Sequence, residues 1–256
     1  HPADKMPARR MPGKRERPGH ALFGIMQGGV TQELREESAK ALVEIGFDGY
    51  AIGGLSVGEP FEEFQHYLGY TAPLLPVEKP RYLMGVGPPE DFLDAIERGV
   101  DMFDCVHPTR SARHGLAFTH DGPIHIKNAR FERDPSPLTE DCHPHVAGFS
   151  RAYLRHLFKA GEMLALRLLS FHNLDFYLRL MRSAREAISA GNFVEFQASF
   201  CERYKKRNRA RDLRRCQRQD CTQEVRSLGC AFVSKEGYCY RRNGQRFCKD
   251  NPTNEN

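Results

Sequence analysis

The chain has 256 residues, of which 40% are hydrophobic and 28% are charged, and its formal net charge is +5. This apolar content is enough for a packed core, so the composition excludes a wholly disordered chain. The modest positive charge is compatible with a polyanionic partner but does not identify one. No apolar run approaches the roughly 18 residues needed to cross a bilayer, and no signal-like stretch lies near the N-terminus. We therefore expect a cytoplasmic protein with no membrane partner.

Basic residues and cysteines concentrate at the two ends of the sequence. Residues 1–20 hold six Lys or Arg against two acids, and residues 203–218 hold nine against one. Like charges repel, so we expect a disordered lead over residues 1–20 and a tail without regular structure over residues 209–256. Five of the eight cysteines lie in that tail, and an odd number gives no closed disulfide framework. A basic RNA-contacting extension and an unrelated fused segment remain alternatives for the tail.

Residues 21–116 repeat a short apolar run followed by an amphipathic stretch. The apolar runs are nearly continuous in hydrophobicity, as buried parallel strands are, and cover Ala21–Met26, Gly49–Ile52, Arg81–Val86 and Met102–Val106. The intervening stretches have helical spacing and cover Gln32–Ile45, Pro60–Leu75 and Pro89–Arg98. Four βα units form either an open doubly wound sheet or half of a (β/α)8 barrel. The turn at Gln27–Thr31 lacks the G-x-G-x-x-G pattern of a nucleotide-binding open sheet, which favours the second half of a TIM barrel.

The pattern changes over residues 117–208. An Asp121-Gly122 turn between alternating residues predicts a β-hairpin over Ala117–Asn128. Helical spacing predicts two long helices over Ser150–Leu169 and Leu174–Ala190, with Ser150 and Asn173 as N-caps. The compact region is expected to end near residue 208.

Asp104 lies in an apolar run near the C-terminal end of the fourth predicted strand, which is the end from which barrel enzymes act. A carboxylate with little water around it must be paired, hydrogen-bonded or used in chemistry, because burying a lone charge is costly. A structural ion pair is the alternative to a catalytic role for this residue.

Glycine-rich turns close the three preceding strands. Glycines let a flat ring approach the backbone, and the amide of Gln27 offers a donor and an acceptor for a base edge. Leu55 and Met84 offer apolar faces on which a ring could stack. These features favour a base-binding pocket at the strand ends, although each glycine pair could merely turn the chain.

Six segments, in this order, resemble the sequence blocks of bacterial tRNA-guanine transglycosylases: FGIMQGGV, IGFDGYAIGGLSVGEP, KPRYLMGVG, RGVDMFDCVHPTRSARHG, SRAYL and HNLDFYL. The resemblance runs from about Arg17 to about Asn208 and corresponds to the second half of a family member. The family fold is a (β/α)8 barrel with a zinc-binding subdomain near its end. The resemblance therefore implies half a barrel, an altered zinc-type subdomain and C-terminal helices.

By this resemblance, Asp104 is the nucleophile that attacks C1′ of the wobble guanosine in a tRNA anticodon loop. Guanine leaves, and a 7-deazaguanine base such as preQ1 replaces it on the way to queuosine, with no nucleotide cofactor. Arg110 and Arg113 would hold anticodon-loop nucleotides. The base would be bound at six positions of the strand ends: Gln27, Gly53, Gly54, Leu55, Met84 and Gly85.

Two features of the family have no full counterpart in this sequence. Family members use further aspartates on earlier barrel strands, which nothing before Ala21 matches, so we expect no base exchange by this chain alone. Its exposed sheet edges should pair with a second copy or with an N-terminal half. The family zinc pattern, C-x-C-x-x-C followed by His, retains only its first and last ligands. Cys142, His145 and His172 could form a three-ligand zinc site, with His143 as a fourth ligand, and the favoured alternative is a subdomain held by packing alone.

Three functions follow from these observations. The first is a tRNA-guanine transglycosylase or a fragment of one. The second is a truncated, catalytically inactive tRNA-binding or subunit-like homologue that keeps the scaffold. The third, an unrelated phosphate-binding half barrel, would require a glycine-rich anion loop where Pro108-Thr109-Arg110 stands.

Overall fold

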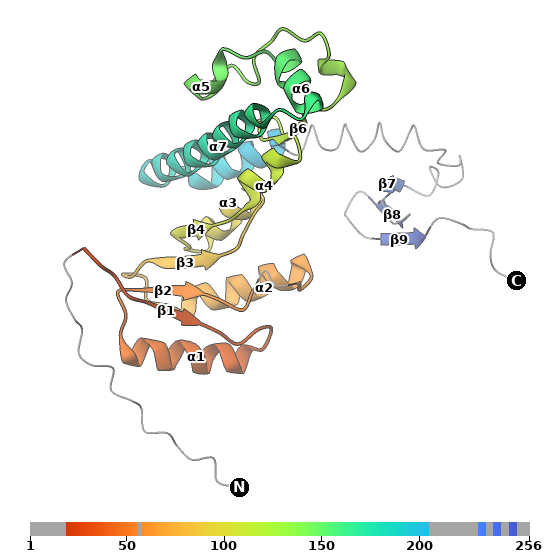
Figure 1. The fold of residues 1–256 in the computed structure, drawn as a ribbon. Coiled ribbons are helices and arrows are strands. Elements are labelled where there is room, and N and C mark those ends of the chain that lie inside the picture. Colours follow the sequence, from red (N-terminus) through yellow and green to blue (C-terminus); the bar gives the residue numbers. More distant parts are fainter. Residues whose placement is uncertain (1–18, 56–57, 205–229, 234–237, 242–245, 250–256) are drawn as a thin grey trace, which may run out of the picture. The chain divides into compact units, whose positions relative to one another are not determined.

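A computed structural model describes residues 19–55, 58–204, 230–233, 238–241 and 246–249 of the chain (Figure 1). Most of the predicted lead and tail lie outside the described residues. The chain divides into two compact units, the first formed by His1–Val86 and Asp94–Cys105 and the second by Gly87–Leu93 and Val106–Asn256. No described helix combines the length and apolar composition that crossing a bilayer would require.

The first unit contains a four-stranded parallel sheet in which the strands follow chain order. Its strands are β1 (Phe23–Met26), β2 (Gly49–Ile52), β3 (Arg81–Met84) and β4 (Met102–Asp104). All four predicted strands are therefore present. β3 ends two residues earlier than predicted, because Gly85 takes a φ of 77° that an extended strand does not allow.

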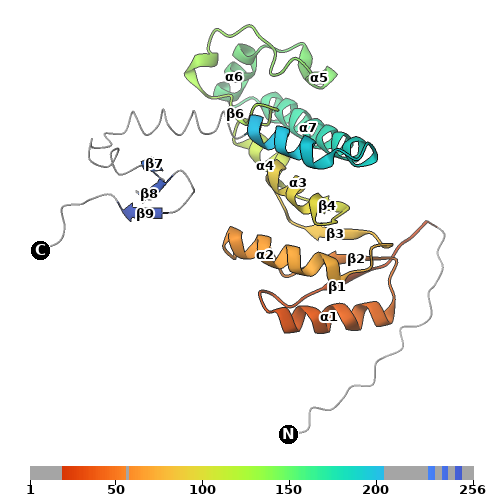
Figure 2. The ribbon, with the colours of Figure 1, turned by 180° about the vertical axis from the view of Figure 1, so that it is seen from behind.

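Helices α1 (Gln32–Ile45) and α2 (Phe61–Thr71) connect the first three strands, and the short helix η1 (Ala72–Leu74) follows α2. α1 contacts β1 and α2, and Figures 1 and 2 show it running along the sheet. Arg35 and Ala39 lie one helical turn apart and are the buried residues of α1. Helix α3 (Pro89–Glu97) is divided between the two units. The three predicted helices are thus confirmed within a few residues.

The second unit is mainly helical. Helix α4 (His107–Arg113), which the sequence pattern did not predict, packs against α7 (Met163–Ser189), and residues 193–204 are also helical. The predicted hairpin is confirmed but short, since β5 (Leu116–Ala117) and β6 (Ile124–His125) pair through only two residues each. The remaining elements are η2 (Ala129–Phe131), α5 (Pro144–Ala147) and α6 (Arg151–Ala160). Their shared core includes Ile124, Ile126, Phe131, Leu138, Val146, Leu154 and Leu169.

The predicted boundary between the two long helices is wrong. α6 begins after its N-cap Ser150, as predicted, but ends at Gly161, which adopts a left-handed conformation with φ 77°. α7 then runs without a break through Asn173. Asn173 is fully buried and uses its side chain for tertiary hydrogen bonds to the backbone of Pro108, Leu116 and Phe118 instead of capping a helix.

Three further strands lie in the predicted tail. They are β7 (Cys230–Val233), β8 (Tyr238–Arg241) and β9 (Arg246–Lys249), and they form an antiparallel sheet. These segments are therefore regular, contrary to the expectation of a tail without regular structure.

Candidate active site

The candidate site is built at the C-terminal edge of the parallel sheet. Parallel pairing places Met26 beside Ile52 and Met84 beside Asp104. The residues that follow these strand ends therefore share one edge of the first unit. Six predicted base-binding positions and the predicted nucleophile all belong to this unit.

Gln27 lies against the turn that follows β2. A Cβ atom built on Gly53 would lie 2.6 Å from Nε2 of Gln27, and one on Gly54 would lie 3.2 Å from its Oε1. Gly54 also has a φ of 66°, a region that other residues rarely adopt. The side chain of Gln27 is exposed, whereas Gly53 is buried. Gly54 thus needs glycine for its backbone conformation, and a side chain at Gly53 would also meet Cγ2 of Ile25 at 2.9 Å and the carbonyl oxygen of Met26 at 3.0 Å.

Arg35 of α1 occupies the other side of the same turns. Its side chain is fully buried, and its Nε donates to the carbonyl oxygen of Gly29 at 2.6 Å. Its terminal nitrogens donate to the carbonyl oxygens of Gly53, at 3.3 and 3.4 Å, and of Gly54, at 3.2 Å. Burial lowers the pKa of the guanidinium below its ordinary value, an effect that the negative charge of Glu59 opposes. A single cation therefore links the turns after β1 and β2.

Asp104 is the last residue of β4, and its carboxylate is held by two donors. Its Oδ1 accepts a hydrogen bond from the Tyr82 hydroxyl at 2.7 Å and from the Gly85 backbone N–H at 3.2 Å. The hydrogen bond to Asp104 raises the pKa of Tyr82, so this phenol remains a donor at neutral pH. Asp104 is exposed, contrary to the expectation of a carboxylate with little water around it. β4 is an edge strand that pairs only with β3 among the described strands, and its Met102 is 45% exposed as well. The carboxylate is nevertheless oriented by hydrogen bonds, without a paired cation among the described residues.

The two apolar residues of the predicted pocket differ in exposure. Leu55 is 5% exposed, so its side chain belongs mainly to the core, whereas Met84 is half-buried beside Asp104. Met84 therefore has the more accessible apolar surface for a ring.

Arg110 and Arg113 lie three residues apart on α4 and are both exposed. Both arginines belong to the second unit, whereas the strand ends belong to the first. Their spacing places both cations near the same face of the helix.

Two residues of the site were missed by sequence reasoning. Arg35 could have been found from its one-turn spacing to Ala39 on the buried face of α1. Tyr82 lies two residues before Met84 on the same strand, so the alternation of side chains places both on one face.

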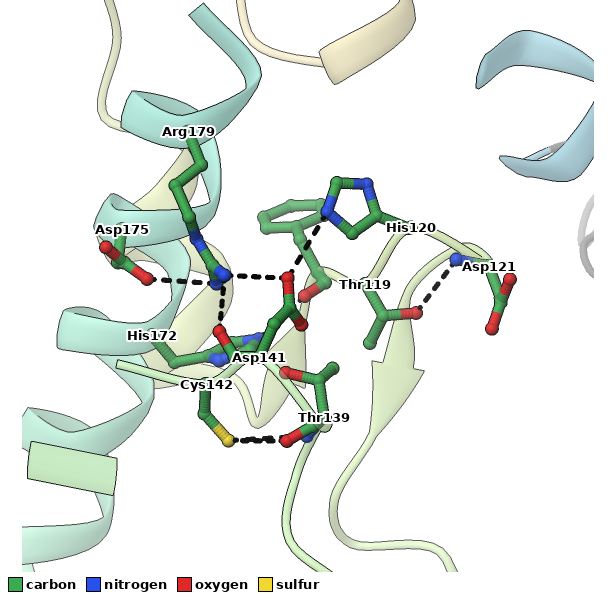
Figure 3. Close-up of polar contacts among 10 residues, drawn as sticks. Thr119, His120, Asp121, Thr139, Asp141, Cys142, His172, Asp175 and Arg179 are labelled. Carbon is green, nitrogen blue, oxygen red and sulfur yellow. Dashed lines mark hydrogen bonds and ion pairs between the residues drawn. The ribbon is translucent and has the colours of Figure 1, made fainter. Parts of the chain in front are cut away.

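The residues of the predicted zinc site are engaged in other contacts, and Figure 3 shows two of them, Cys142 and His172. His172 is buried, and its Nε2–H donates to the Phe118 carbonyl at 2.7 Å. The Cys142 thiol donates to the Thr139 carbonyl at 2.8 Å. The rings of His143 and His145 lie 4.9 Å apart.

These residues do not fit a structural zinc ion. Nδ1 of His172 is buried without a hydrogen-bond partner, so this imidazole could in principle ligate a metal. The described residues, however, contain no group of three or more His, Cys, Asp or Glu side chains placed to hold a metal ion. Pro144 and Ala147, which stand where the family pattern has cysteines, carry no donor atoms. Cys142, His145 and His172 are therefore not brought together as the three-ligand site.

An ion-pair network lies beside these residues instead. Arg179 of α7 donates through Nη1 to the backbone carbonyl and, at 2.6 Å, to the carboxylate of Asp141. Its Nη2 lies 2.9 Å from the carboxylate of Asp175, and Nε2 of His120 lies 3.6 Å from that of Asp141 (Figure 3). Partial burial raises the pKa of Asp141. The positive charge of Arg179 and the neighbouring His120 lower this pKa by more, so the net shift is downward. The network attaches the segment before Cys142 to α7.

Comparison with known proteins agrees with the resemblance. The queuine tRNA-ribosyltransferase family matches residues 7–206. Curated queuine tRNA-ribosyltransferases include proteins from Zymomonas mobilis, 56% identical over 73% of this chain and 49% of the relative, and from Cereibacter sphaeroides, 59% identical over 72% and 50%. A relative from Halothermothrix orenii is 52% identical over 77% of this chain and 53% of its own length. The chain thus spans about half the length of these relatives, and it belongs to the queuine tRNA-ribosyltransferase family.

Proposed function

We propose that this chain carries the nucleophile and part of the base pocket of a tRNA-guanine transglycosylase. The observation that carries the proposal is the carboxylate of Asp104 at the end of β4. Tyr82 and Gly85 fix its Oδ1, and no described residue donates a hydrogen bond to its Oδ2. An oriented carboxylate with one unengaged oxygen suits nucleophilic attack.

In the proposed reaction, Oδ2 of Asp104 attacks C1′ of the wobble guanosine, and the bond from C1′ to N9 breaks. The bonding electrons leave with guanine, which takes up a proton from a general acid. The incoming base, preQ1, then loses its N9 proton and attacks C1′, and Asp104 leaves as a carboxylate. The donors on Oδ1 stabilise the negative charge that returns to Asp104 in this second step.

The neighbouring strand ends would hold the base. Gln27 would bind a polar base edge, the glycine turn after β2 would give the ring close access to the backbone, and Met84 would cover one face of the ring. The base must leave its stack in the anticodon loop to reach Asp104. Arg110 and Arg113 would contact phosphates of that loop, and a tRNA substrate would be met in the cytoplasm.

The partner that completes the site would be an N-terminal half of the barrel. β1 is an edge strand that pairs only with β2 among the described residues. Leu22 next to β1, Ile25 on β1 and Leu34 on α1 are 61%, 46% and 52% exposed, so each offers an apolar side chain that a further element could cover. We propose that further barrel strands cover this surface and close a TIM barrel.

A second function is supported by the length of the match. Because the chain spans about half of its relatives, it would be a tRNA-binding or subunit-like homologue without exchange activity if no other half is supplied. This alternative requires tRNA binding but no covalent bond to Asp104.

Covalent trapping separates the two functions. The full chain is incubated with a tRNA that has guanosine at position 34, with and without the N-terminal half of the Zymomonas mobilis relative, and analysed on a denaturing gel. When the N-terminal half is present, we expect a tRNA adduct with the unaltered chain and with the control variant Asp121→Asn, whose carboxylate lies in the hairpin turn. Asp104→Asn should give no adduct. Binding of tRNA without an adduct in either mixture would reject the enzymatic proposal and support the alternative.

A further inference from the structure

We propose that Arg35 is a positioning residue that sets the orientation of the base-binding peptide groups at Gly54 and Leu55. The inference rests on the proposed function, because it assigns these groups to a purine-like ligand. The side chain of Arg35 is fully buried and donates hydrogen bonds to three backbone carbonyls, so Arg35 is not a solvent-exposed surface charge.

The hydrogen bonds of Arg35 determine which way the neighbouring N–H groups point. The carbonyl oxygens of Gly53 and Gly54 both face the guanidinium. All described peptide bonds are trans, and a trans peptide carries its C=O and N–H on opposite sides. The N–H groups of Gly54 and Leu55 therefore point away from Arg35, and neither donates to another described residue.

Two consecutive N–H groups on one side of a turn form a concave donor pair, which suits an acceptor such as a purine carbonyl oxygen. The left-handed φ of 66° at Gly54 is the backbone conformation that allows this arrangement. The amide of Gln27 lies directly against Gly53 and Gly54, so it adds a donor and an acceptor at the same place. Arg35 therefore holds the carbonyl side of the turn, and the amide of Gln27 lies next to the same turn.

Arginine is suited to this task in a way that lysine is not. Its planar guanidinium offers five N–H donors in fixed directions, whereas an ammonium group is a compact point charge. Nε serves the turn after β1 and the terminal nitrogens serve the turn after β2. Gly28 makes room for this contact, because a Cβ atom there would lie 2.8 Å from Cγ and from the backbone N of Arg35.

The experiment compares Arg35→Lys and Arg35→Met with the full unaltered chain. The control is Arg98→Met, which removes an arginine that donates to a backbone carbonyl in the same unit, at Asp94. Two quantities are measured below the thermal transition of every variant: the affinity for preQ1 by titration calorimetry, and the amide signals of ¹⁵N-labelled glycines. Arg35→Lys keeps the charge, and so remains informative if Arg35→Met does not fold.

We expect both Arg35 variants to bind preQ1 at least about tenfold more weakly than the unaltered chain, since the donor pair loses its fixed direction. The signals of Gly53 and Gly54 should shift, while those of Gly115 and Gly122 in the second unit should not. Arg98→Met should match the unaltered chain in both measurements. A folded Arg35 variant with unchanged preQ1 affinity would overturn the inference, and so would full recovery by lysine.

The failure of the proposed function is recognisable separately. If the unaltered chain binds no preQ1, the base-binding function of the isolated chain is rejected. The glycine signals then decide on Arg35 alone: unchanged signals of Gly53 and Gly54 in Arg35→Lys would show that Arg35 does not set this turn.

Discussion

Replacing Arg179 by methionine should destabilise the second unit, and removing metal ions should not. Arg179 connects α7 to the segment before Cys142 through Asp141, in the region where the family pattern expects zinc ligands. If the ion-pair network has taken over this connection, the stability of the unit depends on Arg179 and is insensitive to chelators.

The expected magnitude follows from the exposure of the pair. The side chain of Arg179 is 24% exposed and that of Asp141 50% exposed, so solvent screens a large part of their attraction. Exposed ion pairs contribute about 0–1 kcal/mol, and the added hydrogen bond to the Asp141 carbonyl brings the loss to about 1–2 kcal/mol. For a folded region of this size, that loss lowers Tm by about 2–8 °C.

The assay is thermal unfolding of the full chain, followed by circular dichroism with and without EDTA, together with zinc analysis of the purified protein. Arg185→Met is the matched control, because Arg185 is an exposed arginine of the same helix. Asp141→Asn should lower Tm by a similar amount, and the double variant should lose less than the sum of both. Equal Tm values for Arg179→Met and Arg185→Met would refute the reasoning. A zinc ion bound in equimolar amount, whose removal lowers Tm, would refute it as well.

Two further predictions concern buried polar groups of the second unit. Asn173→Leu leaves three backbone groups, at Pro108, Leu116 and Phe118, without their partner, so the free energy of unfolding should fall by about 3 kcal/mol or more in urea titrations; a loss below about 1 kcal/mol would contradict this role. His107 packs beside Phe118, and burial, followed by the charge of Arg110, lowers its pKa below 6.5. Its contribution to stability is therefore complete above the unfolded-state pKa and is lost as the pH falls through the folded-state pKa. The decrease in Tm between about pH 7.5 and 5.5 should be smaller in His107→Gln than in the unaltered chain, and an equal decrease would exclude His107 as a source.

Local sequence patterns were sufficient to predict the strands and helices of the first unit, because each element has its own pattern of apolar residues. Continuous apolar runs gave the strands, helical spacing gave α1 to α3, and the shared edge of a parallel sheet brought Gln27, Gly54 and Asp104 into one unit. The position of Asp104 followed from the end of a strand. Its exposure did not, because burial depends on what packs against β4 and a single sequence does not state that.

The predictions failed where a side chain is satisfied by distant partners. Asn173 has the chemistry of an N-cap, but it hydrogen-bonds to residues more than fifty positions earlier and stays inside α7. Arg35 was not singled out, and although its spacing to Ala39 indicates the buried face of α1, the carbonyls that compensate its burial come from two separate turns. The spacing of apolar residues indicates which face of a helix is buried. It does not indicate which hydrogen-bond partners another element supplies.

The contacts that orient the proposed site are local to the first unit. Tyr82 lies on β3, the strand that pairs with β4, and Gly85 follows β3 directly. Arg35 links the turns after β1 and β2 through hydrogen bonds to backbone carbonyls of these turns. The orientation of the nucleophile and of the base-binding turn is therefore encoded between β1 and β4. An additional half would instead have to cover exposed surface, exclude water from Asp104 and supply a proton for the departing guanine. Binding of the base and orientation of the carboxylate should accordingly survive in the isolated chain, whereas turnover should depend on the partner.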